Sequence, residues 1–128
     1  MRMLGLGIDL VEVSEAERLL GRWGDRLLSR VLTEQERSYV LRNARPAKHL
    51  AVRLAAKEAV YKALQSIPGA RHIGWKEIEV ERTDEGRPEV RLHGEATRLA
   101  RDAGVARISL SLTHTEHTAA AVAVTEGP

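Results

Sequence analysis

The sequence predicts an α+β fold in which a mostly antiparallel sheet packs on a long central helix. Its segments follow one another as strand, helices, hairpin, helix and hairpin, an order typical of α+β proteins with antiparallel sheets. The 128 residues contain no internal repeat, low-complexity segment or linker. We therefore expect one domain spanning residues 1–128, which is long enough to bury a hydrophobic core.

Alternation and helix-capping residues predict the first elements of the chain. Apolar residues occupy every second position of Leu4–Leu10, which is the period of a strand. Ser14 with Glu17 three residues later has the form of a capping box, so we expect a helix to begin there. Gly21 and Gly24 predict that this helix is short or broken.

Two further helices are predicted before the middle of the chain. Thr33 and Glu36 repeat the capping-box pattern, which predicts a helix ending near residue 41. Pro46 interrupts the chain, and a third helix is expected over residues 48–64. The Pro-Gly pair at residues 68–69 then predicts a loop.

The second half of the chain is predicted to hold two hairpins on either side of one helix. Alternating segments around residues 78–80 and 90–92 flank a turn at residues 84–88. A helix is expected over residues 95–103, ended by Gly104. Alternating segments at residues 108–112 and 119–124 flank the loop 113–117.

Composition excludes several classes of protein. The chain has no cysteine, so disulfides, thiolate metal ligands and cysteine nucleophiles are excluded. A net charge of +2 with 3% aromatic residues argues against a nucleic-acid partner. No apolar run is long enough to cross a bilayer and the N-terminus does not resemble a secretion signal, so we expect a cytoplasmic protein with no membrane partner.

Asp9 is the first candidate functional residue. It lies inside the predicted N-terminal strand, where a carboxylate is costly unless it is paired, hydrogen-bonded or bound to a cation. A structural alternative is an aspartate that caps a turn or pairs with an arginine. Both interpretations remain open from this residue alone.

The helix expected over residues 48–64 carries charge on two sides. At about 100° per residue, Arg53 and Lys57 fall together and Glu58 and Lys62 fall together, with the two pairs about 140° apart. The other residues are almost all apolar, which predicts a mostly buried helix with charge admitted at two openings. The structural alternative is a Glu58–Lys62 salt bridge, which would stabilise the helix by roughly a few tenths of a kcal/mol.

His114 is the third candidate, at the end of a predicted strand, where binding groups are common. Its imidazole could contact a phosphate, with neighbouring hydroxyls as further donors, or it could be an ordinary turn histidine. The other four histidines show no metal-ligand spacing with it, so we expect them on the solvent side and predict no zinc site.

Asp9 and Glu58 together would form an oxygen-only cation site. Such a site suits Mg²⁺ when the substrate supplies phosphate oxygens and water fills the other positions. Lys62, one helical turn beyond Glu58, would face the same phosphates as a compact positive charge. Neither GxxxxGK[ST] nor GxGxxG is present. These residues suggest a metal-dependent enzyme acting on a diphosphate and leave its substrate open.

The motifs resemble the signature of the phosphopantetheinyl transferase family, in its short branch of holo-acyl-carrier-protein synthases. Gly7–Val13 matches the N-terminal pattern G-[IVL]-D, and Arg53–Leu64 matches the central K-E-[AS]-x-x-K-A. Gly86–Pro88 matches the G-[KR]-P turn, and Ser111–Thr115 matches the late H-[TS] motif before an alanine-rich strand. The resemblance covers essentially the whole chain, with the motifs in order.

The resemblance implies a reaction and a role for each motif residue. The family transfers 4′-phosphopantetheine from coenzyme A to a serine of apo acyl carrier protein, in fatty acid biosynthesis. Asp9 and Glu58 would bind Mg²⁺, which grips the diphosphate of coenzyme A. Lys62 would stabilise or protonate the leaving adenosine 3′,5′-bisphosphate. Glu58 or a metal-held water would accept the serine proton.

The resemblance also implies a nucleotide pocket shared between subunits. Arg53, His114 and Thr115 would hold the 3′-phosphate and adenosine end of coenzyme A. Gly86 and Pro88 would line the pocket from a neighbouring subunit, because this branch is typically a homotrimer with sites at its interfaces.

A row of arginines is expected to dock the acidic carrier protein. Arg18, Arg22 and Arg26 recur at spacings of four, and Arg30 continues the row, so they would form one stripe on a helix. Such charge matching mainly raises the encounter rate and weakens with salt. A solvated helix face is the structural alternative.

The chain departs from the family pattern at two places, and two other functions stay open. Residues 65–69 replace the family's glycine-rich turn and Leu54 replaces an aromatic residue, so we assign no backbone contacts there. The same transfer could serve polyketide or peptide-synthetase carrier domains, although enzymes of that branch are about twice as long. In a different class, the chain would be a non-catalytic basic protein-binding module that needs no divalent metal.

Overall fold

The computed structural model describes residues 1–82 and 86–128. Its elements follow the predicted order, with two short 3-10 helices (η1 and η2) added before the first hairpin. They are β1 (Arg2–Glu12), α1 (Val13–Trp23), α2 (Asp25–Val31), α3 (Glu34–Arg42), α4 (Pro46–Leu64), η1 (Ala70–His72), η2 (Trp75–Glu77), β2 (Ile78–Arg82), β3 (Pro88–Leu92), α5 (Gly94–Asp102), β4 (Arg107–His114) and β5 (Thr118–Gly127).

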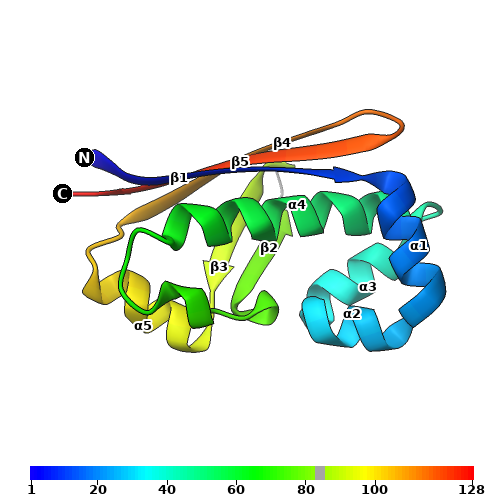
Figure 1. The fold of residues 1–128 in the computed structure, drawn as a ribbon, viewed down its shortest axis with the longest axis horizontal. Coiled ribbons are helices and arrows are strands. Elements are labelled where there is room, and N and C mark those ends of the chain that lie inside the picture. The colour runs from blue at the N-terminus through cyan, green and yellow to red at the C-terminus, as the bar shows by residue number, and fades with distance from the viewer. Residues whose placement is uncertain (83–85) are drawn as a thin grey trace.

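Two antiparallel sheets pack on α4, and strand β3 of one contacts strand β4 of the other (Figure 1). One has the strand order β1-β5-β4 and the other is the β2-β3 hairpin. Helices α1, α2 and α3 gather at one end of α4, and α5 lies near the other end. The predicted α+β fold with antiparallel sheets is confirmed. Within the described residues, no helix is both long and apolar enough to span a membrane.

The contact between β1 and α4 depends on two glycines. A Cβ atom on Gly7 would lie 1.9 Å from the carbonyl oxygen of Ala59, and one on Gly5 would lie 1.9 Å from that of Ala63. Ala59 and Ala63 are one helical turn apart, which matches the two-residue step between the glycines. The strand backbone therefore lies directly on the helix backbone, with no side chain between them.

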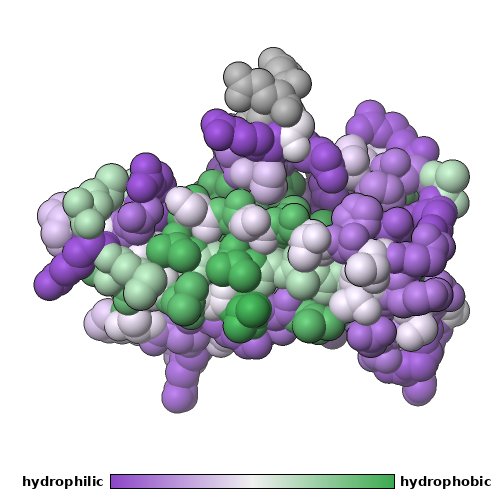
Figure 2. Space-filling model, turned by 90° about the horizontal axis from the view of Figure 1, so that it is seen from above, coloured by the Kyte–Doolittle hydropathy of each residue, from purple (hydrophilic) through white to green (hydrophobic). Residues whose placement is uncertain are grey.

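The large apolar residues of β1 consequently point away from α4. Leu6, Ile8 and Leu10 are 58%, 63% and 62% exposed. Register pairs Ile8 with Val122 of β5, which is also exposed. Figure 2 shows these side chains as an apolar patch with a hydrophilic rim on the outer face of the sheet. The alternation predicted the strand correctly, but the face that it buries carries glycine and aspartate.

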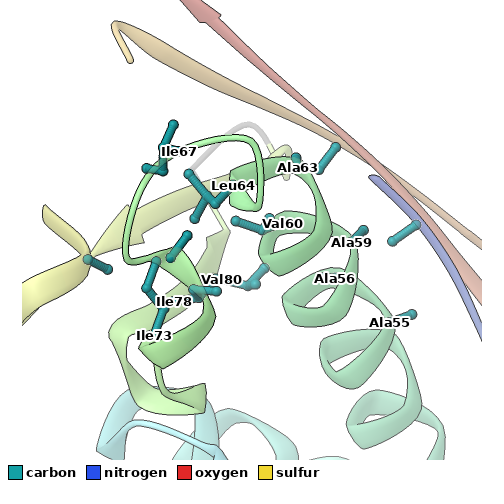
Figure 3. Close-up of a cluster of buried hydrophobic side chains, with 14 residues drawn as sticks. Ala55, Ala56, Ala59, Val60, Ala63, Leu64, Ile67, Ile73, Ile78 and Val80 are labelled. Carbon is teal, nitrogen blue, oxygen red and sulfur yellow. The ribbon is translucent and has the colours of Figure 1, made fainter. Parts of the chain in front are cut away.

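The main hydrophobic cluster lies on both sides of α4, with its small residues facing the three-stranded sheet and its larger residues on the other side (Figure 3). Val60 and Leu64 of α4 pack there with Ile73, Ile78 and Val80. A second cluster fills the space between α4 and α1, α2 and α3, and includes Leu28, Leu32, Val40 and Leu50. Helix α4 is thus covered on several sides, in agreement with its nearly continuous apolar sequence.

The predicted helix boundaries are confirmed in part. The Thr33 capping box is present: the backbone N–H of Thr33 donates to Glu36 Oε1 at 2.9 Å, and that of Glu36 donates to Thr33 Oγ1 at 3.3 Å. The box at Ser14 was wrong, because β1 runs directly into α1 and Val13 already has helical structure. The break falls at Gly24, where φ is +51°, and not at Gly21.

The first hairpin pairs as predicted, with Ile78 opposite Leu92 and Val80 opposite Val90. Part of its expected turn, residues 83–85, lies outside the described residues.

Replacing Gly7 by alanine should destabilise the protein, because the new methyl group has no room against Ala59. We expect the free energy of unfolding to fall by about 1–3 kcal/mol or more, the usual cost of overpacking. Gly21→Ala is the matched control, since Gly21 is exposed within α1 and its Cβ would meet nothing within 4 Å. That change should stabilise by about 0.5–1 kcal/mol. Chemical denaturation measures both, and equal effects would contradict the close contact.

Candidate active site

Helix α4 and strand β1 bring two of the predicted site residues into contact. Lys62 Nζ donates to Asp9 Oδ1 at 3.2 Å and to the carbonyl oxygen of Ile8 at 2.9 Å. The Asp9 side chain is 19% exposed and that of Lys62 is 48% exposed. The alternative Glu58–Lys62 salt bridge is absent from residues 1–82 and 86–128, because the lysine turns to the strand instead.

Glu58 lies on α4 one helical turn before Lys62, with its carboxylate unpaired in the described residues. It precedes Ala59, whose carbonyl lies against Gly7, two residues before Asp9. No hydrogen bond or ion pair involves this carboxylate in the described part of the chain. Glu58 also lines a pocket of about 270 Å³ with Tyr61 and Trp75. A half-buried carboxylate with free oxygens is able to bind a cation or to accept a proton.

The donor set fits Mg²⁺ better than a metal that needs a full protein cage. Among the described residues, no three His, Cys, Asp or Glu side chains come together to hold a metal ion. Asp9 and Glu58 supply two carboxylates, and Mg²⁺ commonly takes its remaining ligands from substrate phosphates and water. The site therefore suits an ion that arrives with a diphosphate.

Lys57, next to Glu58 in the sequence, is a buried structural cation. Its Nζ contacts Glu36 Oε1 at 2.7 Å and donates to the carbonyl oxygens of Trp75 and Ile78 at 2.9 and 2.5 Å. Burial lowers the pKa of Lys57, and the Glu36 carboxylate opposes that shift. The sequence placed Lys57 at an opening of the helix, but these contacts instead hold α4 against the second sheet.

The other side of α4 faces a pocket of about 410 Å³, which we call the β4 pocket. Four of the five expected nucleotide-binding residues line it together within one chain: Arg53, Gly86, Pro88 and His114. Gly86 and Pro88 were expected from a neighbouring subunit, whereas here they share the pocket with Arg53 of the same chain. Arg53 is 3% exposed, and its guanidinium group lies over the Tyr39 ring. Burial lowers the pKa of Arg53. The structure thus brings together residues that are up to 61 positions apart in the chain (114 − 53).

Thr115 does not line the β4 pocket. Its backbone N–H donates to the Thr118 carbonyl at 2.8 Å, and its hydroxyl accepts from the N–H groups of His117 and Thr118 at 3.3 and 3.1 Å. In this structure Thr115 therefore shapes the turn between β4 and β5, next to His114.

Two of the histidines expected on the solvent side are partly buried. His49 packs edge-on against the Tyr39 ring, with 5.5 Å between ring centroids, and burial together with Arg53 lowers its pKa. His93 Nε2 lies 2.8 Å from Glu79 Oε1, which is buried. The sequence carried no signal for either contact, because both partners are distant in the chain.

The predicted docking arginines lie on two helices, because Gly24 ends α1 before α2 begins. Arg18 pairs with Glu15 at 2.6 Å. The guanidinium carbons of Arg22 and Arg26 lie 5.0 and 6.0 Å from the centroid of the Trp23 ring. The expectation of a stripe on one helix was wrong.

Trp23 was missed in the sequence, although an aromatic residue between two arginines was a usable signal. It is 42% exposed and lines a pocket of about 260 Å³. Leu19, Arg26, Leu27 and Arg30 complete that pocket. The basic surface of α1 and α2 therefore includes an apolar hollow.

Comparison with known proteins identifies the family to which the chain belongs. A sequence model of the 4′-phosphopantetheinyl transferase superfamily matches residues 5–123. The holo-[acyl-carrier-protein] synthase of Moorella thermoacetica is 48% identical over 124 residues, covering 97% of this chain and 94% of that protein. That of Syntrophotalea carbinolica is 45% identical over 124 residues, with 96% and 95% covered.

The fold agrees with solved structures as well. A holo-(acyl-carrier-protein) synthase from Bacillus anthracis, in complex with CoA (3′,5′-ADP), superimposes with a TM-score of 0.77 at 30% identity, covering 98% of both chains. Sequence motifs, fold and full-length similarity all lead to one assignment. This chain belongs to the 4′-phosphopantetheinyl transferase superfamily.

Proposed function

We propose that this chain is a holo-acyl-carrier-protein synthase. It transfers 4′-phosphopantetheine from coenzyme A to a serine of apo acyl carrier protein and releases adenosine 3′,5′-bisphosphate, in fatty acid biosynthesis. The observation that carries this proposal is the contact of Lys62 with Asp9, one helical turn along α4 from the unpaired carboxylate of Glu58. Relatives at 45% and 48% identity over nearly their full lengths have that name.

We also propose that residues 1–128 form one transferase domain that acts in the cytoplasm. The absence of cysteine fits a reducing compartment.

The reaction exchanges one phosphorus–oxygen bond for another. The serine oxygen bonds to the β-phosphorus of coenzyme A, and the bond from that phosphorus to the bridging oxygen breaks, so the bisphosphate leaves with the electron pair. Bound Mg²⁺ would supply charge neutralisation at the diphosphate, held by Asp9 and Glu58. The ammonium of Lys62 lies at the same place and can stabilise the charge on the departing bisphosphate.

Two groups are able to take the serine proton. The Glu58 carboxylate has no competing hydrogen bond in the described residues, so it can act directly as the base. A water molecule in the same site is the alternative. Helix α4 fixes the backbone of Glu58 in either case, because the preceding residue, Lys57, is anchored in the core by Glu36 and the Trp75 carbonyl.

We propose a homotrimer with its active sites between subunits. Arg53 and Glu58 are five residues apart and face directions about 140° apart on α4, so one chain presents the two half-sites on different sides. Exposed Leu6, Ile8 and Leu10 make an apolar patch beside Asp9. Contiguous apolar patches of this kind typically mark interfaces. A neighbouring chain packed there would bring its β4 pocket towards the Asp9–Glu58 site.

Removing either proposed metal ligand should abolish transfer. We expect Glu58→Gln and Asp9→Asn to lower the rate at least about 100-fold, because each removes a charge that holds the diphosphate site together. Intact-protein mass spectrometry of apo acyl carrier protein, incubated with the chain, coenzyme A and Mg²⁺, measures the gain of one phosphopantetheinyl group. Glu95→Gln on α5 is the matched control and should remain active, since Glu95 pairs with Arg98 on the surface.

The same assay separates the alternative functions. A mass gain that a chelator abolishes supports the metal-dependent transferase. Gain only on polyketide or peptide-synthetase carrier domains would replace the fatty-acid carrier. No gain on any carrier, with partner binding unchanged in Glu58→Gln, would favour a non-catalytic binding module.

Reversing a docking charge should weaken carrier binding and spare the donor. Arg22→Glu or Arg26→Glu should raise KM for the carrier by about tenfold, equivalent to about 1.4 kcal/mol, with KM for coenzyme A nearly unchanged. The effect should shrink as salt increases. Arg101→Glu on exposed α5 is the control. Steady-state kinetics with each substrate varied in turn would contradict the docking surface if both variants matched the control.

A charge in the apolar patch should dissociate the trimer. Ile8→Asp should yield monomers by light scattering and lose activity, because a carboxylate would be buried in the interface. Leu41→Asp is a matched control: Leu41 is 50% exposed on α3, away from the sheet. It should remain trimeric and active. A monomeric wild-type protein with full activity would overturn the proposed assembly.

A further inference from the structure

Three arginine side chains converge on the ring of Tyr39. Their guanidinium carbons lie 4.3 Å (Arg53), 5.7 Å (Arg82) and 5.9 Å (Arg42) from its centroid. His49 packs against the edge of the same ring. Arg42 lies on α3 with Tyr39, Arg53 lies on α4 and Arg82 lies on β2, so the ring gathers positive charge from three elements.

No carboxylate forms an ion pair with these three guanidinium groups within residues 1–82 and 86–128. Acidic side chains do lie nearby, in a pocket of about 330 Å³ that the three arginines also line. Each is committed elsewhere: Glu36 to Lys57, Glu79 to His93 and Thr33, and Glu81 to Arg91. The Glu36 charge opposes the lowering of the Arg53 pKa, but no carboxylate in the described residues pairs directly with a guanidinium group of the cluster.

Arg53 is the most strongly constrained member of the cluster. It is 3% exposed, and its Nε atom is buried without a hydrogen-bond partner. A buried donor left unsatisfied costs about 1–3 kcal/mol, and like charges in a partly dehydrated site repel one another. An anion that accepts from the guanidinium would relieve both costs.

The cluster is continuous with the β4 pocket. Arg53 and Arg82 line both that pocket and the pocket beside Tyr39, so their guanidinium groups stand at the boundary between the two. A nucleotide in the β4 pocket could therefore place a phosphate against them. Guanidinium groups suit this role because their planar N–H pairs match phosphate oxygens.

We infer that Tyr39 is a positioning residue that orients Arg53, with Arg42 and Arg82 as additional cations, to select donors carrying a 3′-phosphate. The inference rests on the proposed function, which assigns the nucleotide of coenzyme A to the β4 pocket. It adds three residues to the anion site: the aromatic support and two arginines. The aromatic face holds the guanidinium planes by cation–π attraction and leaves their edges for the phosphate.

Tyr39 is well placed to act as a rigid support. It lies in the second turn of α3, the helix that begins at the Thr33 capping box, and its carbonyl oxygen accepts from Asn43 Nδ2 at 2.6 Å. Its hydroxyl forms no hydrogen bond in the part of the chain that the structure describes. The ring, and not the hydroxyl, is therefore the functional part.

The test compares coenzyme A with dephospho-coenzyme A, which lacks only the 3′-phosphate. Tyr39→Leu should lower kcat/KM for coenzyme A about tenfold and leave that for dephospho-coenzyme A nearly unchanged, with KM for the carrier unaltered. Tyr39→Phe keeps the ring and should resemble the wild type. Equal losses on the two donors in Tyr39→Leu, or equal losses in the Leu and Phe variants, would overturn the inference.

Two further variants keep the result decisive. Arg82→Gln changes an exposed residue and should show the same selective loss, so it carries the test if Tyr39→Leu fails to fold by circular dichroism. Arg53→Gln distinguishes a failure of the Tyr39 inference from a failure of the proposed nucleotide site. A selective loss in Arg53→Gln without one in Tyr39→Leu and Arg82→Gln refutes this inference alone. No selective loss even in Arg53→Gln refutes the nucleotide assignment of the proposed function.

Discussion

The direct backbone contact between β1 and α4 is the constraint on which the rest of the structure depends. Gly5 and Gly7 leave no side chain between the strand and the helix, so the polar group two residues further on, Asp9, comes within reach of Lys62. The same contact turns the large apolar residues of β1 outward. This one contact therefore positions Asp9 for the proposed metal site. It also exposes the apolar face on which a neighbouring chain is proposed to pack.

A buried ion pair sets the orientation of α4 about its own axis. All three donors of the Lys57 ammonium are used, by Glu36 and two backbone carbonyls. Removing one partner of a buried pair typically costs about 3–5 kcal/mol, so the helix has little freedom to rotate. Arg53 and Glu58 are held facing different pockets as a result. A substrate that needs both groups is then bound most simply between two copies of the chain.

The charges on the surface fall into three groups with different tasks. Asp9 and Glu58 are the carboxylates proposed to hold a cation that carries phosphates. The arginines around Tyr39 are cationic and lack carboxylate partners in the described residues, which suits a phosphate itself. The basic residues around Trp23 adjoin an apolar hollow, which suits an acidic protein surface. A near-zero net charge conceals this separation, because the electrostatics of function are local.

Local patterns in the sequence determined the strands, the Thr33-capped helix and the identity of the motif residues Asp9, Glu58, Lys62 and His114. Alternation and capping act over a few residues and can be read without a partner. Only the tertiary structure decided which face of β1 is covered, that Lys57 is buried, and that Arg53 and Arg82 join Arg42 at the Tyr39 ring. Those outcomes depend on contacts such as Gly5 with Ala63, 58 positions apart (63 − 5), which no local period records.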